Sequence, residues 1–369
     1  VYRVASELLH PNPNPTEGER LAILAVGGYG RGEMAPHSDV DLLFLMQWKI
    51  TPWAESLIES MLYIFWDLHL KIGHASRSIK DCLRLGKDDY TIRTALLENR
   101  YLVGDQAIAL ALEQKLTEDL FRNTASDFIE AKLEERASRH KKQGGQRYLV
   151  EPNVKEGKGG LRDLQTLFWI GKYLHNVGRG ADLVRLGLFR QEEYDRFHAA
   201  ETFLMAVRNH LHLVAGRPVD QLTFDLQVEI AERLGYSDTG GRRAVEHFMQ
   251  DYFRHATAVG EVTRNFLTAL EAQHVKKAPS LAAMFRRRRP VKPGFEVRQN
   301  RLDIAHPKAF LKDKLIILRL FEVGLRSGYL IHPDAMRLVT ANLSLIDDEM
   351  RISPEANRLF LDLLLKHGN

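Results

Sequence analysis

The sequence predicts an α+β protein, in which a small domain with a mixed β-sheet is followed by a mostly α-helical domain. Two apolar, β-rich runs, at 21–26 and 40–45, flank a glycine-rich bend and are short enough to be strands. Apolar residues recur at helical spacing from 105 to 142 and again from 164 to 270. Because 369 residues exceed what one hydrophobic core usually supports, we expect two or three domains.

Breaks in composition predict where the domains begin and end. We expect an N-terminal segment and linker at 1–20, the sheet domain at 21–125, and the helical domain at 126–275. The remainder, 276–369, should contain a basic linker, a small hairpin and C-terminal helices. The linker carries four consecutive arginines at 286–289, and such a run is more often a solvated connector than a binding groove.

The composition is that of an ordinary soluble globular protein, with 44% hydrophobic and 27% charged residues. The single cysteine, Cys82, excludes an internal disulfide and fits a reducing compartment. The sequence contains no apolar run long enough to cross a membrane and no visible signal peptide, so we expect a cytoplasmic protein. The net charge of +4 is too modest to argue for nucleic acid.

The most informative stretch is 21–45, which reads LAILAVGGYGRGEMAPHSDVDLLFL. Asp39 and Asp41 are two residues apart, and the period of a strand places both carboxylates on one side. Two neighbouring carboxylates repel each other unless a cation lies between them, and Mg²⁺ is commonly held by carboxylates together with substrate phosphates. Asp39 and Asp41 are therefore candidate catalytic ligands of Mg²⁺ or Mn²⁺.

The glycine bend between the two runs predicts a phosphate site. Gly27 and Gly28 allow backbone N–H groups to approach a polyphosphate, and Arg31 and Ser38 are further candidate ligands. The pattern is neither a P-loop nor a dinucleotide fingerprint. A glycine pair alone, or an Asp-x-Asp on a strand alone, is common in turns and solvated edges. Together, at this spacing, they resemble the DNA polymerase β-like nucleotidyltransferase superfamily.

That resemblance implies a third carboxylate on a neighbouring strand. Glu98, within the apolar segment TALLENRYLV at 94–103, is the best-placed candidate for a third catalytic metal ligand, and Asp67 is the alternative. Glu98 is adjacent to Asn99 and Arg100, so a structural ion pair is equally compatible with its position.

A second glycine-rich stretch, YLVEPNVKEGKGGLRDLQT at 148–166, places three cations within eight residues. Lys155 and Arg162 are candidate nucleotide ligands, because the loop can close over an anion at the start of a helix near Leu161. Alternatively, Glu156 and Asp163 pair with these cations and the loop only connects helices. Further along, Arg208, His210 and His212 are better explained as partly buried polar groups than as a metal site, because histidines two apart on a helix do not share a face.

Three stretches, at 27–43, 151–167 and 208–227, together resemble the N-terminal half of the bacterial bifunctional PII uridylyltransferase/uridylyl-removing enzymes, the GlnD family. The resemblance implies transfer of UMP from UTP to a tyrosine of the PII nitrogen-regulatory protein, with release of pyrophosphate. It places the metal-binding pair on Asp39 and Asp41 and the glycine pair on Gly27 and Gly28. Members of that family continue into HD and ACT domains, so the resemblance implies transfer alone for this sequence.

The expected partners are therefore UTP and PII, with neither nucleic acid nor a membrane. Residue patterns do not identify the base that is selected. An adenylyltransferase or tRNA-tailing enzyme remains an alternative, as does a non-catalytic nucleotide-binding regulatory module.

Overall fold

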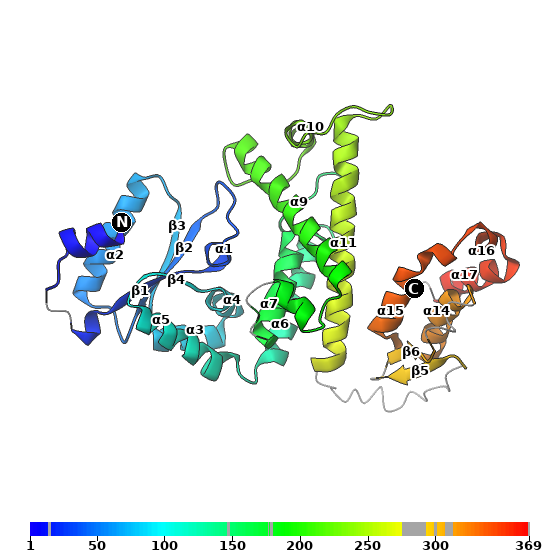
Figure 1. Cartoon of the computed structure of the whole chain (residues 1–369), viewed down its shortest axis with the longest axis horizontal. Helices are drawn as coiled ribbons and strands as arrows, with labels where there is room; N and C mark the ends of the chain where they lie inside the picture. Colours follow the sequence, from blue (N-terminus) through cyan, green and yellow to red (C-terminus); the bar gives the residue numbers. More distant parts are fainter. Residues whose placement is uncertain are drawn as a thin grey trace. The chain divides into compact units, whose positions relative to one another are not determined.

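The computed structural model describes residues 1–13, 16–145, 148–175, 177, 180–274, 293–298, 301–306 and 313–367 (Figure 1). The chain forms two compact units, Val1–Val262 and Thr263–Asn369, which are considered separately. The arginine run predicted to be a linker lies outside the described residues.

The first unit begins with a four-stranded mixed sheet, as the sequence predicts. Its strands are β1 (Leu21–Ala25), β2 (Val40–Met46), β3 (Ile72–Ser78) and β4 (Arg100–Gly104), in the order β3-β2-β1-β4. β1 pairs antiparallel with both β2 and β4, whereas β2 and β3 are parallel. All five residues of the central strand β1 are buried, because helices cover both faces of the sheet.

Side chains of β2 alternate between two hydrophobic cores. Leu42 and Phe44 pack on one side with α2, whereas Leu43 and Leu45 pack on the other with α3, α4 and α5. Asp41 has the parity of Leu43 and therefore belongs to the α3–α5 side. The helices of this part are α1 (Gly27–Arg31), α2 (Pro52–Asp67), α3 (Ile79–Asp88), α4 (Tyr90–Leu97) and α5 (Gln106–Lys115), with shorter helical turns η1 (Val4–Leu9), η2 (Glu17–Glu19) and η3 (Leu116–Phe121).

The long helix predicted from 105 to 142 is interrupted. α5 passes into the π-helical turn η3, and α6 starts only at Ala125. Asn123 between them has a φ of 62°, a left-handed conformation that breaks a helix and that asparagine tolerates better than most residues. The remaining helices of the first unit are as expected: α6 (Ala125–Lys142), α7 (Leu161–His175), α8 (Gly180–Arg185), α9 (Gln191–Ala215), α10 (Phe224–Arg233) and α11 (Ala244–His274), the last of which runs on into the second unit.

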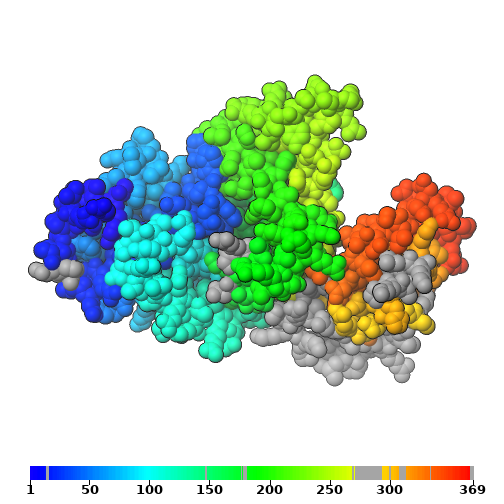
Figure 2. All heavy atoms as spheres, viewed as in Figure 1, coloured from blue at the N-terminus to red at the C-terminus, as the bar shows by residue number. Residues whose placement is uncertain are grey.

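The sheet part and the helical part of the first unit pack directly against each other (Figure 2). α4 contacts α7 across this junction, and the ring centroids of Tyr90 in α4 and Phe128 in α6 lie 6.3 Å apart. The domain boundary predicted between 125 and 126 falls within this compact unit and stays a prediction.

The second unit contains the predicted hairpin, β5 (Phe295–Arg298) with β6 (Arg301–Ile304), extended by the parallel strand β7 (Leu330–Ile331). Its helices are α14 (Ile316–Ser327), α15 (Pro333–Ala341), η4 (Leu343–Leu345), α16 (Asp348–Ile352) and α17 (Pro354–His367). Leu302, Leu320 and Val339 are among the residues of its own small core. Among the described residues, no helix is long and apolar enough to cross a lipid bilayer.

Candidate active site

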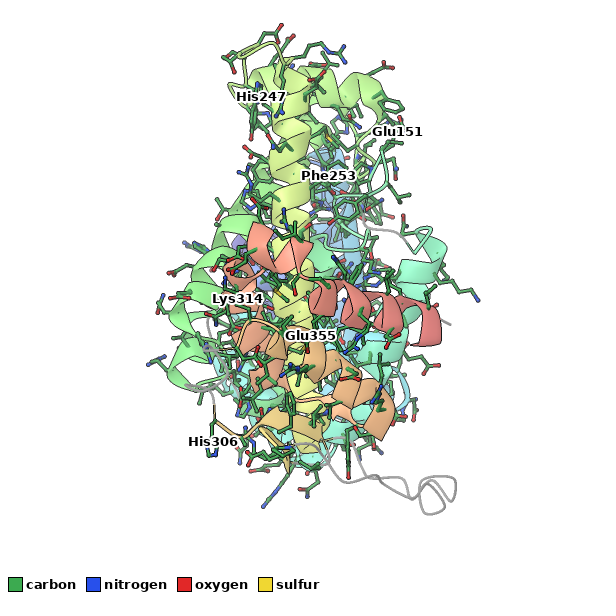
Figure 3. The ribbon with its side chains drawn as sticks, turned by 90° about the vertical axis from the view of Figure 1, so that its right-hand side faces the viewer. Glu151, His247, Phe253, His306, Lys314 and Glu355 are labelled. Carbon is green, nitrogen blue, oxygen red and sulfur yellow. The ribbon has the colours of Figure 1, made fainter. Side chains whose placement is uncertain are left out.

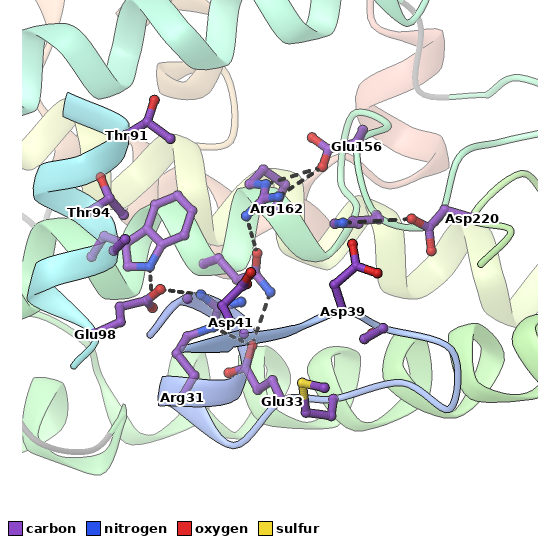
Figure 4. Close-up of a pocket in the computed structure, with 18 of the residues that line it drawn as sticks. Arg31, Glu33, Asp39, Asp41, Thr91, Thr94, Glu98, Glu156, Arg162 and Asp220 are labelled. Carbon is purple, nitrogen blue, oxygen red and sulfur yellow. Dashed lines mark hydrogen bonds and ion pairs between the residues drawn. The ribbon is translucent and has the colours of Figure 1, made fainter. Parts of the chain in front are cut away.

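All nine predicted site residues line one cavity of about 480 Å³ between the sheet and the helical part of the first unit (Figure 4). They are Gly27, Gly28, Arg31, Ser38, Asp39, Asp41, Glu98, Lys155 and Arg162. Stretches more than a hundred residues apart in the sequence therefore meet at one place. We call this space the first cavity.

Asp39 and Asp41 lie at the start of β2, one just before the strand and one within it. Both line the first cavity, and Figure 4 shows them in the same cleft. Burial and the neighbouring charge of Asp39 raise the pKa of Asp41, whereas Lys155 and Arg31 act to lower it. Such a pair of carboxylates is suited to a divalent cation.

Glycine allows the backbone to approach Asp41 from both sides. Gly27 has a φ of 57°, and a Cβ atom there would lie 3.0 Å from Oδ2 of Asp41. Gly73 is the residue of β3 paired with Asp41, and a Cβ atom there would overlap Oδ1. The role of Gly73 was not recognised from the sequence, because only the register of β3 against β2 reveals it.

Arg31 lies in the first cavity but is already paired with two carboxylates. It donates to Glu33 at 2.8 Å and to Glu98, and its side chain is only 9% exposed. Although burial lowers the pKa of Arg31, Glu98 and Glu33 raise it overall. Its guanidinium also lies over the ring of Trp169, at 5.7 Å from the centroid. These contacts favour an indirect role for Arg31 over the predicted direct contact with phosphate.

The contacts of Glu98 argue against the predicted third metal ligand. Glu98 follows α4, is buried, and accepts hydrogen bonds from Arg31 on one oxygen and from the Trp169 indole on the other. Burial raises its pKa to about 7 even though both donors act in the opposite direction. The alternative, Asp67, ends α2, is exposed and does not line the first cavity. Strand β3, next to β2, carries no carboxylate at all.

Lys155 of the loop before α7, Arg162 in the first turn of α7 and Arg208 of α9 line the opposite wall. Lys155 lies 3.9 Å from Asp220, and burial, Arg208 and Arg162 lower its pKa. Arg162 donates to Glu156 at 3.1 Å and to Gln165 at 2.9 Å. The alternative in which Glu156 pairs with a cation of this stretch is therefore correct for Arg162. Lys158 points elsewhere and lies within 3.4 Å of the carbonyl oxygen of Gly145.

Asp163, the other acid of that interpretation, anchors the loop to α6. It is fully buried and accepts hydrogen bonds from Arg136, Arg139 and His140 of α6 and from the backbone N–H of Gly159. Burial alone would raise its pKa, but these donors lower it to about 2. One interpretation of the sequence paired Asp163 with Lys155 and Arg162, but its partners are instead the residues of α6 and Gly159.

Asp220 organises the cations on the helical wall, and sequence reasoning missed it. It accepts a hydrogen bond of 2.8 Å from Arg208 and lies 3.4 Å from the ring of His212. His212 in turn accepts the backbone N–H of His37, the residue two positions before Asp39. Burial and Arg208 lower the pKa of His212, so a neutral ring is favoured. Asp220, Arg208 and His37 all line the first cavity.

The loop is also held at its other end. Val154 donates to the carbonyl oxygen of Asp220 at 2.8 Å, and Asn153 forms an isolated bridge with Gln221. Glu151, labelled in Figure 3, accepts the backbone N–H of Phe224 at the start of α10. The loop that carries Lys155 is therefore fixed at one end to α6 through Asp163, and at the other to α10 and the segment before it.

A second cavity, of about 380 Å³, borders the first. The two share Gly27, Asp41, Thr91 and Ala95. Its other walls come from β2, β3 and α4, and most of them are apolar.

In the described part of the second unit, Asp303, His332 and Asp334 bring three possible metal ligands together. Arg298 lies 2.7 Å from Asp334 and 3.5 Å from Asp303, and His332 accepts the N–H of Asp334 as the cap of α15. These contacts account for the cluster as a structural ion-pair group.

Comparison with known proteins identifies the same family in both units. The family model for GlnD PII-uridylyltransferase matches residues 127–267, and the model for the uridylyltransferase GlnD third domain matches residues 295–369. Proteins named bifunctional uridylyltransferase/uridylyl-removing enzyme are similar along the whole chain. That of Cereibacter sphaeroides is 65% identical over 369 residues, that of Ruegeria pomeroyi 66% over 366, and that of Bradyrhizobium sp. 47% over 372.

These matches cover 99% to 100% of the chain but 40% of each relative, so the chain spans less than half of their length. The chain belongs to the GlnD uridylyltransferase family.

Proposed function

We propose that this chain transfers UMP from UTP to a tyrosine of the PII protein and releases pyrophosphate. One observation supports this most strongly: the first cavity has a carboxylate pair beside a glycine bend on one wall and Lys155 and Arg208 on the other. A cavity of about 480 Å³ is in the usual range for a small-molecule site. The identity of the nucleotide and of the acceptor comes from the family.

Asp39 and Asp41 would hold Mg²⁺ or Mn²⁺, with substrate phosphates completing the coordination. Carboxylates fit this role, because hard divalent cations prefer oxygen ligands and magnesium is often bound by only one or two protein carboxylates. A bound ion of this kind would neutralise phosphate charge and lower the pKa of the attacking hydroxyl. Glu98 is assigned instead to holding Arg31 in place.

Lys155 would bind the β- and γ-phosphates from the helical wall, where Arg208 adds positive charge while it stays paired with Asp220. The backbone at Gly27 and Gly28 would bind the phosphates from the sheet side, with Ser38 near the aspartates. In the reaction, the tyrosine oxygen forms a bond to the α-phosphorus of UTP. The bond from that phosphorus to the bridging oxygen breaks, pyrophosphate leaves, and the phenolic proton passes to water.

Labelled UTP, Mg²⁺ and purified PII test the proposal. The chain should label PII, and Asp39→Asn and Asp41→Asn should each reduce transfer at least a hundredfold, because the carboxylate charge is lost. Asp67→Asn is the matched control, since Asp67 is exposed and outside both cavities. Circular dichroism should show unchanged folds.

Several outcomes would contradict the proposal. Retention of a tenth of the transfer by either aspartate variant would remove these residues from the catalytic site. Preference for ATP or CTP would indicate a different nucleotidyltransferase, and UTP binding without any transfer would indicate a regulatory module.

A further inference from the structure

The second cavity lies beside Asp41 and differs in character from the first. Its apolar lining residues are Val26, Leu42, Leu43, Ala75, Ile92 and Leu96. Apart from Asp41, its lining includes two residues with charged or titratable side chains, Arg77 and His74. Arg77 shares the face of Asp41, whereas the ring of His74 lies beside Phe44 on the opposite face of the sheet. A site with so few cations is poorly suited to a triphosphate, whereas its apolar walls suit an aromatic ring.

Residues of β3, which is the edge strand of the sheet, line the second cavity. In the sheet that the structure describes, β3 pairs only with β2, so its other edge is free of strands. His74 and Ser76 of this strand are exposed. A free edge can bind an extended polypeptide through main-chain hydrogen bonds, while pockets beside it receive alternate side chains.

The residue of β3 beside Asp41 has no side chain. The residue of β3 paired with Asp41 is Gly73, and any Cβ atom there would overlap the carboxylate. A group held in the second cavity can therefore reach the same carboxylate that faces the first cavity. An in-line displacement needs this arrangement, because the nucleophile and the leaving group lie on opposite sides of the phosphorus.

We propose that the second cavity is the acceptor subsite, which receives the tyrosine ring of an extended segment of the acceptor protein lying along the free edge of β3. The phenolic oxygen then lies at Asp41, and the nucleotide approaches from the first cavity. This inference rests on the proposed function for the chemistry of the acceptor, but the cavity, the free edge and the position of Gly73 are independent of it.

Filling the second cavity tests the subsite. Ala75→Leu should raise the KM for PII at least tenfold, while the affinity for an unreactive UTP analogue with a methylene between the α- and β-phosphorus stays within twofold. Ser76→Leu is the matched control, because Ser76 is the next residue of β3 and lines neither cavity. An unchanged KM in Ala75→Leu, or an equal effect of Ser76→Leu, would overturn the subsite.

A crosslink gives a readout that does not depend on repacking the core. Cys82 is fully buried and burial raises its pKa to about 12, so an introduced cysteine would be the reactive one. Ala75 pairs with Leu43 and therefore shares the face of Asp41, so the Ala75→Cys variant should form a disulfide with PII in which the acceptor tyrosine is replaced by cysteine. Leu110→Cys, on the exposed side of α5, is the control and should not.

Equal crosslinking at both positions, or none at Ala75→Cys, would exclude β3 as the docking edge. The unsubstituted chain separates the two proposals: if it labels PII while neither variant behaves as expected, the subsite fails and the function stands. If it labels no PII, the function itself fails.

Discussion

At the scale of single residues, the ion-pair partners of a cationic side chain determine whether it is available to bind phosphate. Arg31 and Arg162 both line the first cavity, but each donates to a nearby glutamate, Arg31 to Glu33 and Glu98, and Arg162 to Glu156. Among the residues that the structure describes, the ammonium group of Lys155 has one ion-pair partner, Asp220, at 3.9 Å. Lys155 is therefore the cation of the loop best placed to exchange its partner for a phosphate.

Glu98→Gln distinguishes a metal ligand from a residue that positions Arg31. We expect transfer to stay above a tenth of the normal rate and the half-saturating Mg²⁺ concentration to change less than twofold. The free energy of unfolding should fall by about 1–3 kcal/mol, because Arg31 loses part of its charge compensation. Magnesium titration of the transfer rate and urea unfolding measure these effects. A loss as large as that of Asp39→Asn would restore the metal role.

Sequence patterns could predict residues that act through local geometry. The period of a strand placed Asp39 and Asp41 together, and the need for a close backbone approach identified Gly27. Asp220 and Gly73 could not be found in this way, because their roles depend on contacts with segments 65 and 32 residues distant, Lys155 and Asp41. The pairing of Glu98 with Arg31 and Trp169 could not be predicted for the same reason, because it depends on contacts between distant segments.

At the scale of elements, the loop before α7 is positioned by a buried charge group rather than by its glycines alone. Asp163, at the first turn of α7, joins Arg136, Arg139 and His140 of α6 to the backbone of Gly159. The sequence showed the density of charge in α6 and in the loop. It did not show which acid pairs with which cation, because helix packing brings 136–140 against 159–163.

The lowered pKa of Asp163 predicts loss of stability in acid. Its pKa is about 2 in the folded chain and near 3.8 otherwise, so the folded state favours the ionised carboxylate. The stabilisation is present above about pH 4 and is lost as the pH falls towards 2, with a total of about 2 kcal/mol. Urea unfolding of the Asp163→Asn variant between pH 7 and pH 3 should lack this component and show lower stability at neutral pH.

Asp195→Asn, on the exposed surface of α9, is the control and should unfold as the unsubstituted chain does. If the free energy of unfolding of Asp163→Asn depended on pH as that of the unsubstituted chain does, the buried ion-pair group would contribute no net stability.

At the scale of the whole molecule, the two units have separate hydrophobic cores, and the first cavity belongs entirely to the first unit. Sheet and helical residues both line this cavity, so a nucleotide there bridges the two parts of one unit. The alternation of fold type along the chain could be predicted from periodicity. The packing of the two parts against each other could not, since it depends on tertiary contacts such as that between Glu33 and Gln165.

Thermal unfolding should therefore show two transitions, of which only one responds to nucleotide. With Mg²⁺ and UTP at about a hundred times the dissociation constant, the first unit should gain about 2.7 kcal/mol, which corresponds to a shift of roughly 5–10 °C. Calorimetry with and without UTP measures the shift. Equal shifts of both transitions, or of the second alone, would contradict the assignment of the nucleotide to the first unit.

The burial of β1 determines how fast its backbone amides exchange hydrogen with solvent. With strands on both edges and helices over both faces, its amide protons should exchange with solvent only when the whole first unit opens. The bend at Gly27 begins two residues after the end of this strand, so it extends from one of the slowest-opening segments of the unit. The backbone amides of Gly27 and Gly28 are thus held in place before substrate binds. A mutation that destabilises β1 would displace these amides even if every side chain of the first cavity were unchanged.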